Sequence, residues 1–334
     1  MTTKTLKQNS YSSLVSKIGF HCPLWGTGTD SGYSYAAVEL IKAWQAKGIP
    51  VWAQDTDAPV IFNMGQPHFY ERVEGKLNIG YTAWESTEIT ESWVQAMNRM
   101  DEIWAPSQFN IDCYAAAGVT VPLRVLPHGI NENHWSPIRR STDGTFKFLH
   151  IGGDAPRKGA VMVYDAFKEV FGDDPNFQLT LKGRKLQFKP KGENVVHHSE
   201  LIPVEELRQM YYDHHAMIYP TNGEGFGLIP FQAAATGMPV ACTDWGGCTE
   251  FGGYTYPIGV HYLTTPTYAP HIGHWAQPQY EDVVKWMESF TILRYAYAKQ
   301  AFDWSHGLCE KFSWDRVSTL ALEYMTESLN TKHA

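Results

Sequence analysis

A strand–helix alternation that starts twice is the feature that most constrains the fold of this chain. A linker at 131–144 divides the chain into two halves. Before it, a strand-like, a helix-like and a strand-like segment follow one another at 17–21, 35–46 and 49–53. After it, the same order returns at 146–151, 159–171 and 177–181. Such an alternation builds a parallel sheet with helices on both faces. The 334 residues also exceed what one hydrophobic core usually holds. The sequence therefore predicts an α/β fold of two Rossmann-like domains that face a cleft.

The segment 216–240 predicts where a ligand binds. An apolar strand-like run leads into a turn with Glu224, Gly225, Phe226 and Gly227, and then into an alanine-rich helical stretch. Free N–H groups at a helix start after a glycine turn favour an anion, and glycines let the backbone approach it closely. The Glu224 carboxylate would repel a bare phosphate but can accept hydrogen bonds from hydroxyl groups. The segment therefore suits a sugar joined to a diphosphate.

Composition limits the compartment and the partners. The five cysteines are odd in number and form no CxxC pair, so they indicate neither a disulfide framework nor a zinc site. The amino terminus is polar, unlike a signal peptide, and no apolar run is long enough to span a bilayer. We therefore expect a cytoplasmic chain without stable membrane insertion. The net charge of −8 argues against a surface that binds nucleic acid as a whole, although a local basic cleft stays open.

The histidine and aspartate patterns do not predict a metal site. The histidine pairs at 197–198 and 214–215 are adjacent in sequence, so their rings diverge and make poor chelates. Asp55 and Asp57 mimic an Asp-x-Asp metal motif, but nothing around them fits the fold that uses this motif. We interpret these two residues as part of a loop.

Six sequence blocks carry a resemblance to a known family. The segment EGFGLIPFQ at 224–232 closely resembles the Glu-x7-Glu donor motif of the retaining glycosyltransferases of family 4. Five further blocks resemble that family in the same order: GYTAWES at 80–86, MDEIWAPS at 100–107, VLPHGI at 125–130, RKG at 157–159 and FSWDR at 312–316. Together they span most of the chain from Phe20 onward. The resemblance implies the glycosyltransferase B fold, in which the last helix returns to the first domain.

The linker and the last helical segment then set the expected domain limits. Residues 1–13 are expected to form a loose tail. We place an acceptor-side Rossmann-like domain at 14–137 and a nucleotide-sugar-binding domain at 138–308. The helix that packs back on the first domain is expected at 309–334.

The resemblance assigns donor binding to the segment that begins at Glu224. Its carboxylate would accept hydrogen bonds from the sugar hydroxyls. The donor-binding residues that follow are Gly225, Phe226, Gly227 and Leu228. Gln232 stands where the family has a second glutamate that contacts the ribose. An amide can still accept and donate, but it forfeits the stronger charge-assisted bond, so Gln232 either weakens or redirects donor binding.

Two adjacent cations are candidates for holding the diphosphate. Lys158 follows a strand and a glycine turn, where it can neutralise a departing diphosphate as a metal does elsewhere. The family usually places an arginine shortly before this lysine, and this chain has Gly153 there. Arg157 can take that place because a guanidinium holds phosphate bidentately. The alternative is a pair of surface cations beside a helix.

Further candidates come from the first half of the chain. Glu85 follows a strand end, where ligands gather in open α/β sheets, and family members carry a histidine near this place. It would orient an acceptor hydroxyl or stabilise charge at the sugar carbon, or else cap a helix. His128 either touches the donor or packs. By resemblance, the loop at 26–32 borders the acceptor through Gly28, Asp30 and Ser31.

Together with these residues, the resemblance implies a retaining hexosyl- or pentosyltransferase that moves a sugar from a nucleoside diphosphate sugar to an acceptor hydroxyl. Glu85, Lys158 and Glu224 are the catalytic candidates, and neither a metal nor a separate cofactor is expected. A glycan or small-molecule acceptor is favoured, and a hydroxylated base in DNA stays open. The donor nucleotide, its sugar, the acceptor and the oligomeric state are not determined by these patterns.

Three alternatives remain at this point. A nucleotide-sugar-binding protein without transfer activity would explain Gln232. A nucleotide-sugar epimerase shares the two-domain fold, although EGFG is not its usual signature. A nicotinamide dehydrogenase would need the loop at 26–32 to carry the cofactor, yet no acidic residue ends the second strand at Ala53, and Asp55 is only close to it.

Overall fold

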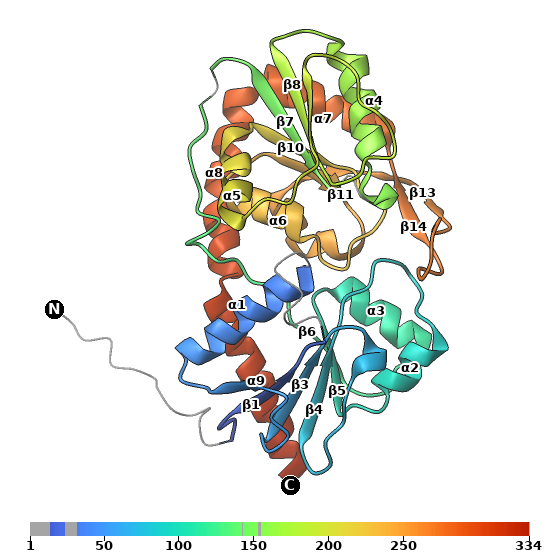
Figure 1. Cartoon of the computed structure of the whole chain (residues 1–334), viewed down its shortest axis with the longest axis vertical. Helices are drawn as coiled ribbons and strands as arrows, with labels where there is room; N and C mark the ends of the chain where they lie inside the picture. The colour runs from blue at the N-terminus through green and yellow to red at the C-terminus, as the bar shows by residue number, and fades with distance from the viewer. Residues whose placement is uncertain (1–13, 24–31, 142, 153–154, 334) are drawn as a thin grey trace, which may run out of the picture. The chain divides into compact units, whose positions relative to one another are not determined.

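Short apolar runs form two six-stranded parallel sheets, one in each half of the chain (Figure 1). The computed structural model describes residues 14–23, 32–141, 143–152 and 155–333. Strands such as β1 (Ile18–His21) and β3 (Val60–Met64) are buried along their whole length. This is the pattern of parallel strands that helices cover on both faces. The predicted α/β class with two Rossmann-like domains is confirmed.

The chain separates into two units that interrupt each other in sequence. The first unit holds the residues up to Ala83, Ile89–Gly129 and Trp314 onward, and the second holds Trp84–Glu88 and Ile130–Ser313. Residues 130–137, which we place in the first domain from the sequence, lie in the second unit. The reason is packing: the Trp135 ring meets the Tyr211 ring edge-on at 5.4 Å between centroids. Just beyond, the Ile138 N–H donates to the Thr236 carbonyl at 3.1 Å.

In the first unit the strand order is β2-β1-β3-β4-β5-β6. Its remaining strands are β2 (Val51–Ala53), β4 (Leu77–Tyr81), β5 (Glu102–Ala105) and β6 (Leu123–Val125). Its helices are α1 (Gly32–Ala46), the 3₁₀ helix η1 (Pro67–Phe69), α2 (Glu91–Met97), α3 (Gln108–Ala117) and α9 (Trp314–His333). The apolar residues of α1 and α9 share one core with β1, β3 and β4. The predicted return of the last helix to the first domain is therefore confirmed.

Helix α3 shows how local sequence sets the ends of an element. The Ser107 hydroxyl accepts from the Asn110 N–H at 3.3 Å, which satisfies one free donor of the first turn. Such a cap stabilises a helix by about 1 kcal/mol. The helix ends at Gly118, whose φ of 99° lies in the left-handed region that glycine adopts without strain.

In the second unit the strand order is β12-β11-β10-β7-β8-β9. These strands are β7 (Phe146–Ile151), β8 (Phe177–Lys182), β9 (Val195–His198), β10 (Ala216–Tyr219), β11 (Val240–Thr243) and β12 (Tyr256–Ile258). The helices are η2 (Pro156–Lys158), α4 (Ala160–Phe171), α5 (Val204–Asp213), α6 (Leu228–Ala235), η3 (Gly246–Tyr254), α7 (Tyr280–Ile292) and α8 (Arg294–Lys311). Alternate strand residues face opposite sides, so Phe148 and Ile218 pack with α4 and α7, whereas Leu149 and Met217 pack with α5, α6 and α8.

After the last strand of the second sheet, the chain forms a two-stranded antiparallel hairpin from β13 (Val260–Thr264) and β14 (Trp275–Pro278). Its connecting loop binds the short segment Trp84–Glu88. The Thr87 N–H donates to the His274 carbonyl at 3.2 Å, and the His274 N–H donates to the Thr87 hydroxyl at 2.8 Å. The sequence patterns predict neither this hairpin nor β3 and β9, because the segments are short and lack a clear period.

Helices α8 and α9 are 18 and 20 residues long and carry charged side chains throughout. A span across a bilayer needs about 20 mainly apolar residues. No helix in the described ranges meets this requirement.

Candidate functional site

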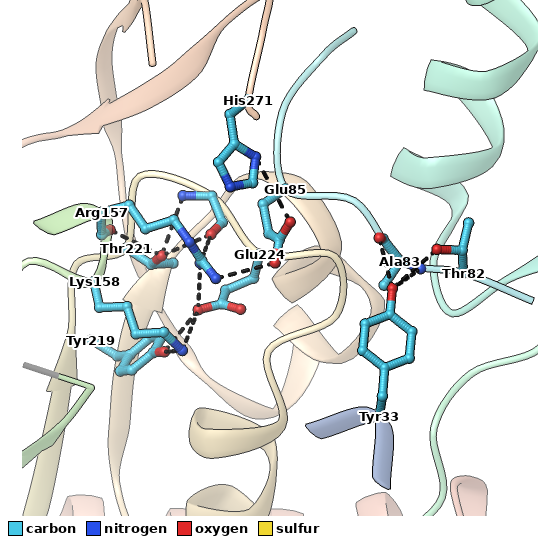
Figure 2. A network of polar contacts seen from close by, with 11 residues as sticks. Tyr33, Thr82, Ala83, Glu85, Arg157, Lys158, Tyr219, Thr221, Glu224 and His271 are labelled. Atoms are coloured by element: carbon cyan, nitrogen blue, oxygen red, sulfur yellow. Dashed lines mark hydrogen bonds and ion pairs between the residues drawn. The ribbon is translucent and has the colours of Figure 1, made fainter. Parts of the chain in front are cut away.

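The candidate site lies at the carboxyl ends of β7 and β10, where the strand order of the second sheet reverses. From β7 the chain runs in opposite directions across the sheet, through β8 and β9 on one side and β10 to β12 on the other. Ligands bind at such a switch point in open α/β sheets. Arg157 and Lys158 follow β7, and Glu224 follows β10. Figure 2 shows that these three predicted residues and Glu85 come together.

Glu224 is a buried carboxylate that two cations and a phenol hold through a single oxygen. Its Oε1 accepts from the Tyr219 hydroxyl at 2.8 Å, and it lies 3.0 Å from Arg157 and 3.1 Å from Lys158 (Figure 2). Burial opposes ionisation, but the two cations and the Tyr219 hydrogen bond outweigh it and lower the pKa of Glu224 to about 2. The carboxylate therefore stays ionised. Its Oε2 has no partner among the residues that the structure describes.

Arg157 joins the two acidic residues of the site. Its guanidinium donates to the Gly223 carbonyl and to Glu85 Oε1, the latter at 3.2 Å, besides pairing with Glu224. Burial alone would lower the pKa of Arg157, but the Glu224 and Glu85 carboxylates raise it above its ordinary value. The sequence leaves open whether this residue is a surface cation, and the structure shows that it is buried.

Lys158 shares a partner with Glu224 that the sequence analysis missed. Its ammonium group donates to the Tyr219 hydroxyl at 3.0 Å, and that hydroxyl donates onward to Glu224. Tyr219 is the last residue of β10 and is fully buried. The one signal for it in the sequence is a hydroxyl at the end of an otherwise apolar strand, five residues before Glu224.

Glu85 reaches the site because its backbone packs closely against Gly223, which has no side chain. A Cβ added at Gly223 would come within 2.2 Å of the Glu85 carbonyl oxygen, so only glycine permits this approach. The helix that follows, α2, begins at Glu91 after Thr90, which rules out Glu85 as its cap. Burial raises the pKa of Glu85 and nearby Glu224 adds to this, whereas Arg157 and Lys158 act against it. A catalytic role for Glu85 stays a prediction.

The donor-motif turn presents its backbone while its apolar side chain is in the core. Gly227 precedes α6 with a φ of 97°, and a Cβ there would lie 2.7 Å from the Cys248 sulfur. The Phe226 ring packs between Phe231 and Phe251, at 5.0 and 5.5 Å between centroids. Of Phe226, therefore, only the backbone can approach a ligand. Gly225 precedes this turn and Leu228 begins α6.

Gln232 lies within α6 and is buried. Its side-chain amide forms no hydrogen bond with any residue of the described ranges. The amide is therefore not held by a neighbour that the structure describes. Contact between Gln232 and a ribose stays a prediction.

The remaining predicted site residues belong to the first unit. The His128 Nδ1 lies 3.3 Å from the Tyr81 hydroxyl, and burial lowers the pKa of His128 to about 3. The imidazole is therefore neutral, and its contact with a donor stays a prediction. Gly28, Asp30, Ser31 and also Gly153 lie outside the described residues. Within those residues, no group of three or more His, Cys, Asp or Glu side chains is arranged to hold a metal ion.

Comparison with known proteins points to one family. The family profile described as "Glycosyl transferases group 1" matches residues 145–261, which include Arg157, Lys158 and Glu224. A putative glycosyltransferase of a Sulfolobus islandicus filamentous virus is 24% identical over 55% of this chain and 54% of its own length. The serotype-specific mannosyltransferase WbdA of Escherichia coli is 30% identical over 29% of this chain and 13% of its own length. The chain thus spans about half the length of the viral relative and less of WbdA.

A solved structure extends the likeness to the whole fold. Anabaena HepE, solved in complex with UDP and glucose, superposes with a TM-score of 0.69 at 14% identity, over 93% of this chain and 99% of HepE. The narrower resemblance to family 4 stays a prediction. Residues 145–261 are thus similar to the group 1 glycosyl transferases, and the chain has the glycosyltransferase B fold.

Proposed function

We propose that this chain is a retaining glycosyltransferase that moves a sugar from a nucleoside diphosphate sugar to an acceptor hydroxyl without a metal ion. The observation that carries the proposal is the ionised Glu224 beside two cations at the switch point of the second sheet. A sugar diphosphate needs this combination, because its hydroxyls seek an acceptor and its phosphates seek positive charge.

Glu224 has one oxygen for the protein and one for the sugar. Within the part of the chain that the structure describes, all three side-chain contacts of Glu224 fall on Oε1. Its Oε2 can therefore accept from a sugar hydroxyl while Oε1 stays in place. Since the contacts on Oε1 hold the side chain before the donor arrives, little reorganisation is needed on binding.

Arg157 and Lys158 supply the charge for the diphosphate. Both lie within about 3 Å of Glu224 and therefore close to where the sugar's anomeric substituent would sit. Fixed cations stabilise the charge that develops on a departing diphosphate, the role that a metal has elsewhere. The complex of HepE with UDP and glucose makes a uridine diphosphate sugar the first donor to test.

For the acceptor we favour a neutral hydroxyl of a glycan or small molecule. The net charge of −8 works against a polyanionic acceptor such as DNA, although a hydroxylated base remains worth testing. We expect retention to follow a front-face route, in which the leaving phosphate helps to deprotonate the acceptor. The alternative function is nucleotide-sugar binding without transfer, which the replacement of the second motif glutamate by Gln232 favours.

The test begins with thermal shift of the purified chain against UDP-, GDP-, ADP- and dTDP-sugars, with NAD as a control. A ligand that binds the folded state raises its melting temperature. The donor that does so is then incubated with acceptors and EDTA, and the anomeric configuration of the product is read by NMR. Retained configuration and full activity in EDTA are expected. Binding without turnover on any acceptor would favour the alternative, and a shift with NAD alone would overturn both.

A further inference from the structure

His271 faces Glu85 from the loop between β13 and β14. Its Nδ1 lies 3.9 Å from Glu85 Oε2, on the side of the carboxylate away from Arg157 (Figure 2). Backbone contacts between the two segments also hold His271 near Glu85. An isolated bridge between Glu88 and Ile272 and the paired bonds of Thr87 with His274 tie the two segments together. The sequence gives no sign of this pairing, since the loop has no period or motif.

The His271 ring is held by three other rings. Its centroid is 4.7 Å from that of Trp84, 5.4 Å from Tyr268 and 5.1 Å from Trp275. The side chain is 9% exposed, and Nδ1 is buried without a hydrogen bond. A buried polar atom without a partner is costly and uncommon. The Glu85 carboxyl, 3.9 Å away, can satisfy it after a small rotation that brings the two groups to hydrogen-bond length.

The titratable groups around Glu85 come from three parts of the second unit. Arg157 and Lys158 come from η2, Glu224 from the turn after β10, and His271 and Tyr268 from the hairpin loop. Burial first, and Arg157 second, lower the pKa of His271 to about 4. Burial raises the pKa of Glu85. The imidazole thus resists protonation while the carboxyl resists ionisation, so a proton between them is drawn to the carboxyl.

We propose that Glu85 and His271 hold one proton between them and that this proton gives the site its net positive charge toward a diphosphate. With one proton, the pair is neutral whichever member carries it. Glu224, Arg157 and Lys158 then leave one uncompensated positive charge. Loss of the proton turns Glu85 into a second carboxylate, and the site becomes neutral. His271 is therefore a positioning residue that acts through Glu85, and the proposal rests on the proposed function.

The first test measures the affinity for UDP by calorimetry between about pH 5 and 9. Because the pair loses its proton in one macroscopic step, UDP binding is expected to weaken about tenfold as pH rises through that step, the effect of one charge near the diphosphate. Glu85→Gln removes the titrating carboxyl and should make the affinity independent of that step, whatever its absolute value. His271→Ala should displace the step. A flat profile in the native chain, or an unchanged step in Glu85→Gln, would overturn the proposal.

A matched control and a second readout keep the outcome clear. His274→Asn, an exposed position on the same loop, should leave the pH step unchanged. Nitrogen NMR shifts of His271 should follow one step in the native chain and a displaced one in Glu85→Gln, without any nucleotide present. Identical His271 titrations in the two proteins would contradict the shared proton. If UDP, GDP and ADP fail to bind while the His271 titration still depends on Glu85, the proposed function fails and the proton pair stands.

Discussion

The carboxyl ends of the two sheets carry polar groups of different kinds (Figure 2). In the first unit the groups after β4 are neutral: the Tyr33 hydroxyl accepts from the Ala83 N–H at 2.8 Å, donates to the Ala83 carbonyl at 3.0 Å and lies 3.0 Å from the Thr82 hydroxyl. Buried His128 is also neutral there, because burial lowers its pKa to about 3. In the second unit, two cations and two acidic residues meet after β7 and β10.

This difference indicates that the two sheet ends recognise different parts of the substrates. Burying charges is costly and is repaid only when they pair closely, as they do around Glu224. The second sheet end therefore offers a fixed electrostatic field, which suits a charged donor. Around Tyr33 and His128 the first sheet end offers neutral hydrogen-bonding groups, which suit a neutral hydroxyl. We expect changes in the second unit to affect donor chemistry and changes in the first to be smaller and insensitive to salt.

The largest effect is expected from Glu224→Gln. Without the carboxylate the sugar loses its charged acceptor, so transfer should fall by roughly a thousandfold. Binding of UDP alone should not weaken, because a negative charge beside the diphosphate is removed. Transfer rates and UDP affinity measured on the same protein check this. The exposed Glu288→Gln on α7 is the control, and equal loss of UDP affinity and transfer in Glu224→Gln would contradict the assignment to the sugar.

Acid should weaken the second unit in a defined pH window. The pKa of Glu224 is lowered from 4.5 to about 2 in the folded state. The carboxylate therefore contributes stability above pH 4.5, and that contribution is lost as the pH falls through about 2. The shift corresponds to a stabilisation on the order of 3 kcal/mol. Urea unfolding of the native chain and Glu224→Gln should differ by this order near neutral pH and converge in acid; a constant difference would contradict it.

Lys158→Ala should weaken UDP binding by about tenfold, the usual size of one charge-assisted contact to a phosphate. Lys158→Arg should recover part of the loss, because the charge is kept. Calorimetry at two salt concentrations measures both. The exposed Lys285→Ala on α7 should bind UDP as the native chain does. If Lys158→Ala binds UDP normally, the cation serves only to hold Glu224.

The smallest effect is expected from Tyr33→Phe in the first unit. Loss of its hydrogen bonds should lower the free energy of unfolding by about 1 kcal/mol, independently of salt. UDP affinity should change less than twofold, since no charge is altered. Thermal unfolding and calorimetry test this. A Tyr33→Phe protein that binds UDP as weakly as Lys158→Ala would break the division between the two sheet ends.

The sequence by itself determined what depends on near neighbours in the chain. The strand–helix alternation, the Ser107 and Gly118 ends of α3 and the turn from Glu224 to Gly227 are set by residues a few positions apart. Such patterns predict local structure directly, because the hydrophobic period and the backbone freedom of a segment depend only on its own residues. Gly28, Asp30 and Ser31 lie outside the described residues, so their predicted contacts with the acceptor stay predictions.

Only the tertiary structure decided which side chains meet. Glu85 and Arg157 are 72 positions apart, and no spacing rule predicts their 3.2 Å contact. Tyr219 joins the site because β10 lies beside β7, and His271 joins it because an unpredicted hairpin binds the segment at Thr87 and Glu88. Strand order and loop docking are set by the packing of whole elements. The pairing of charges and the pKa shifts in the site follow from that packing, so they could not be predicted from the sequence alone.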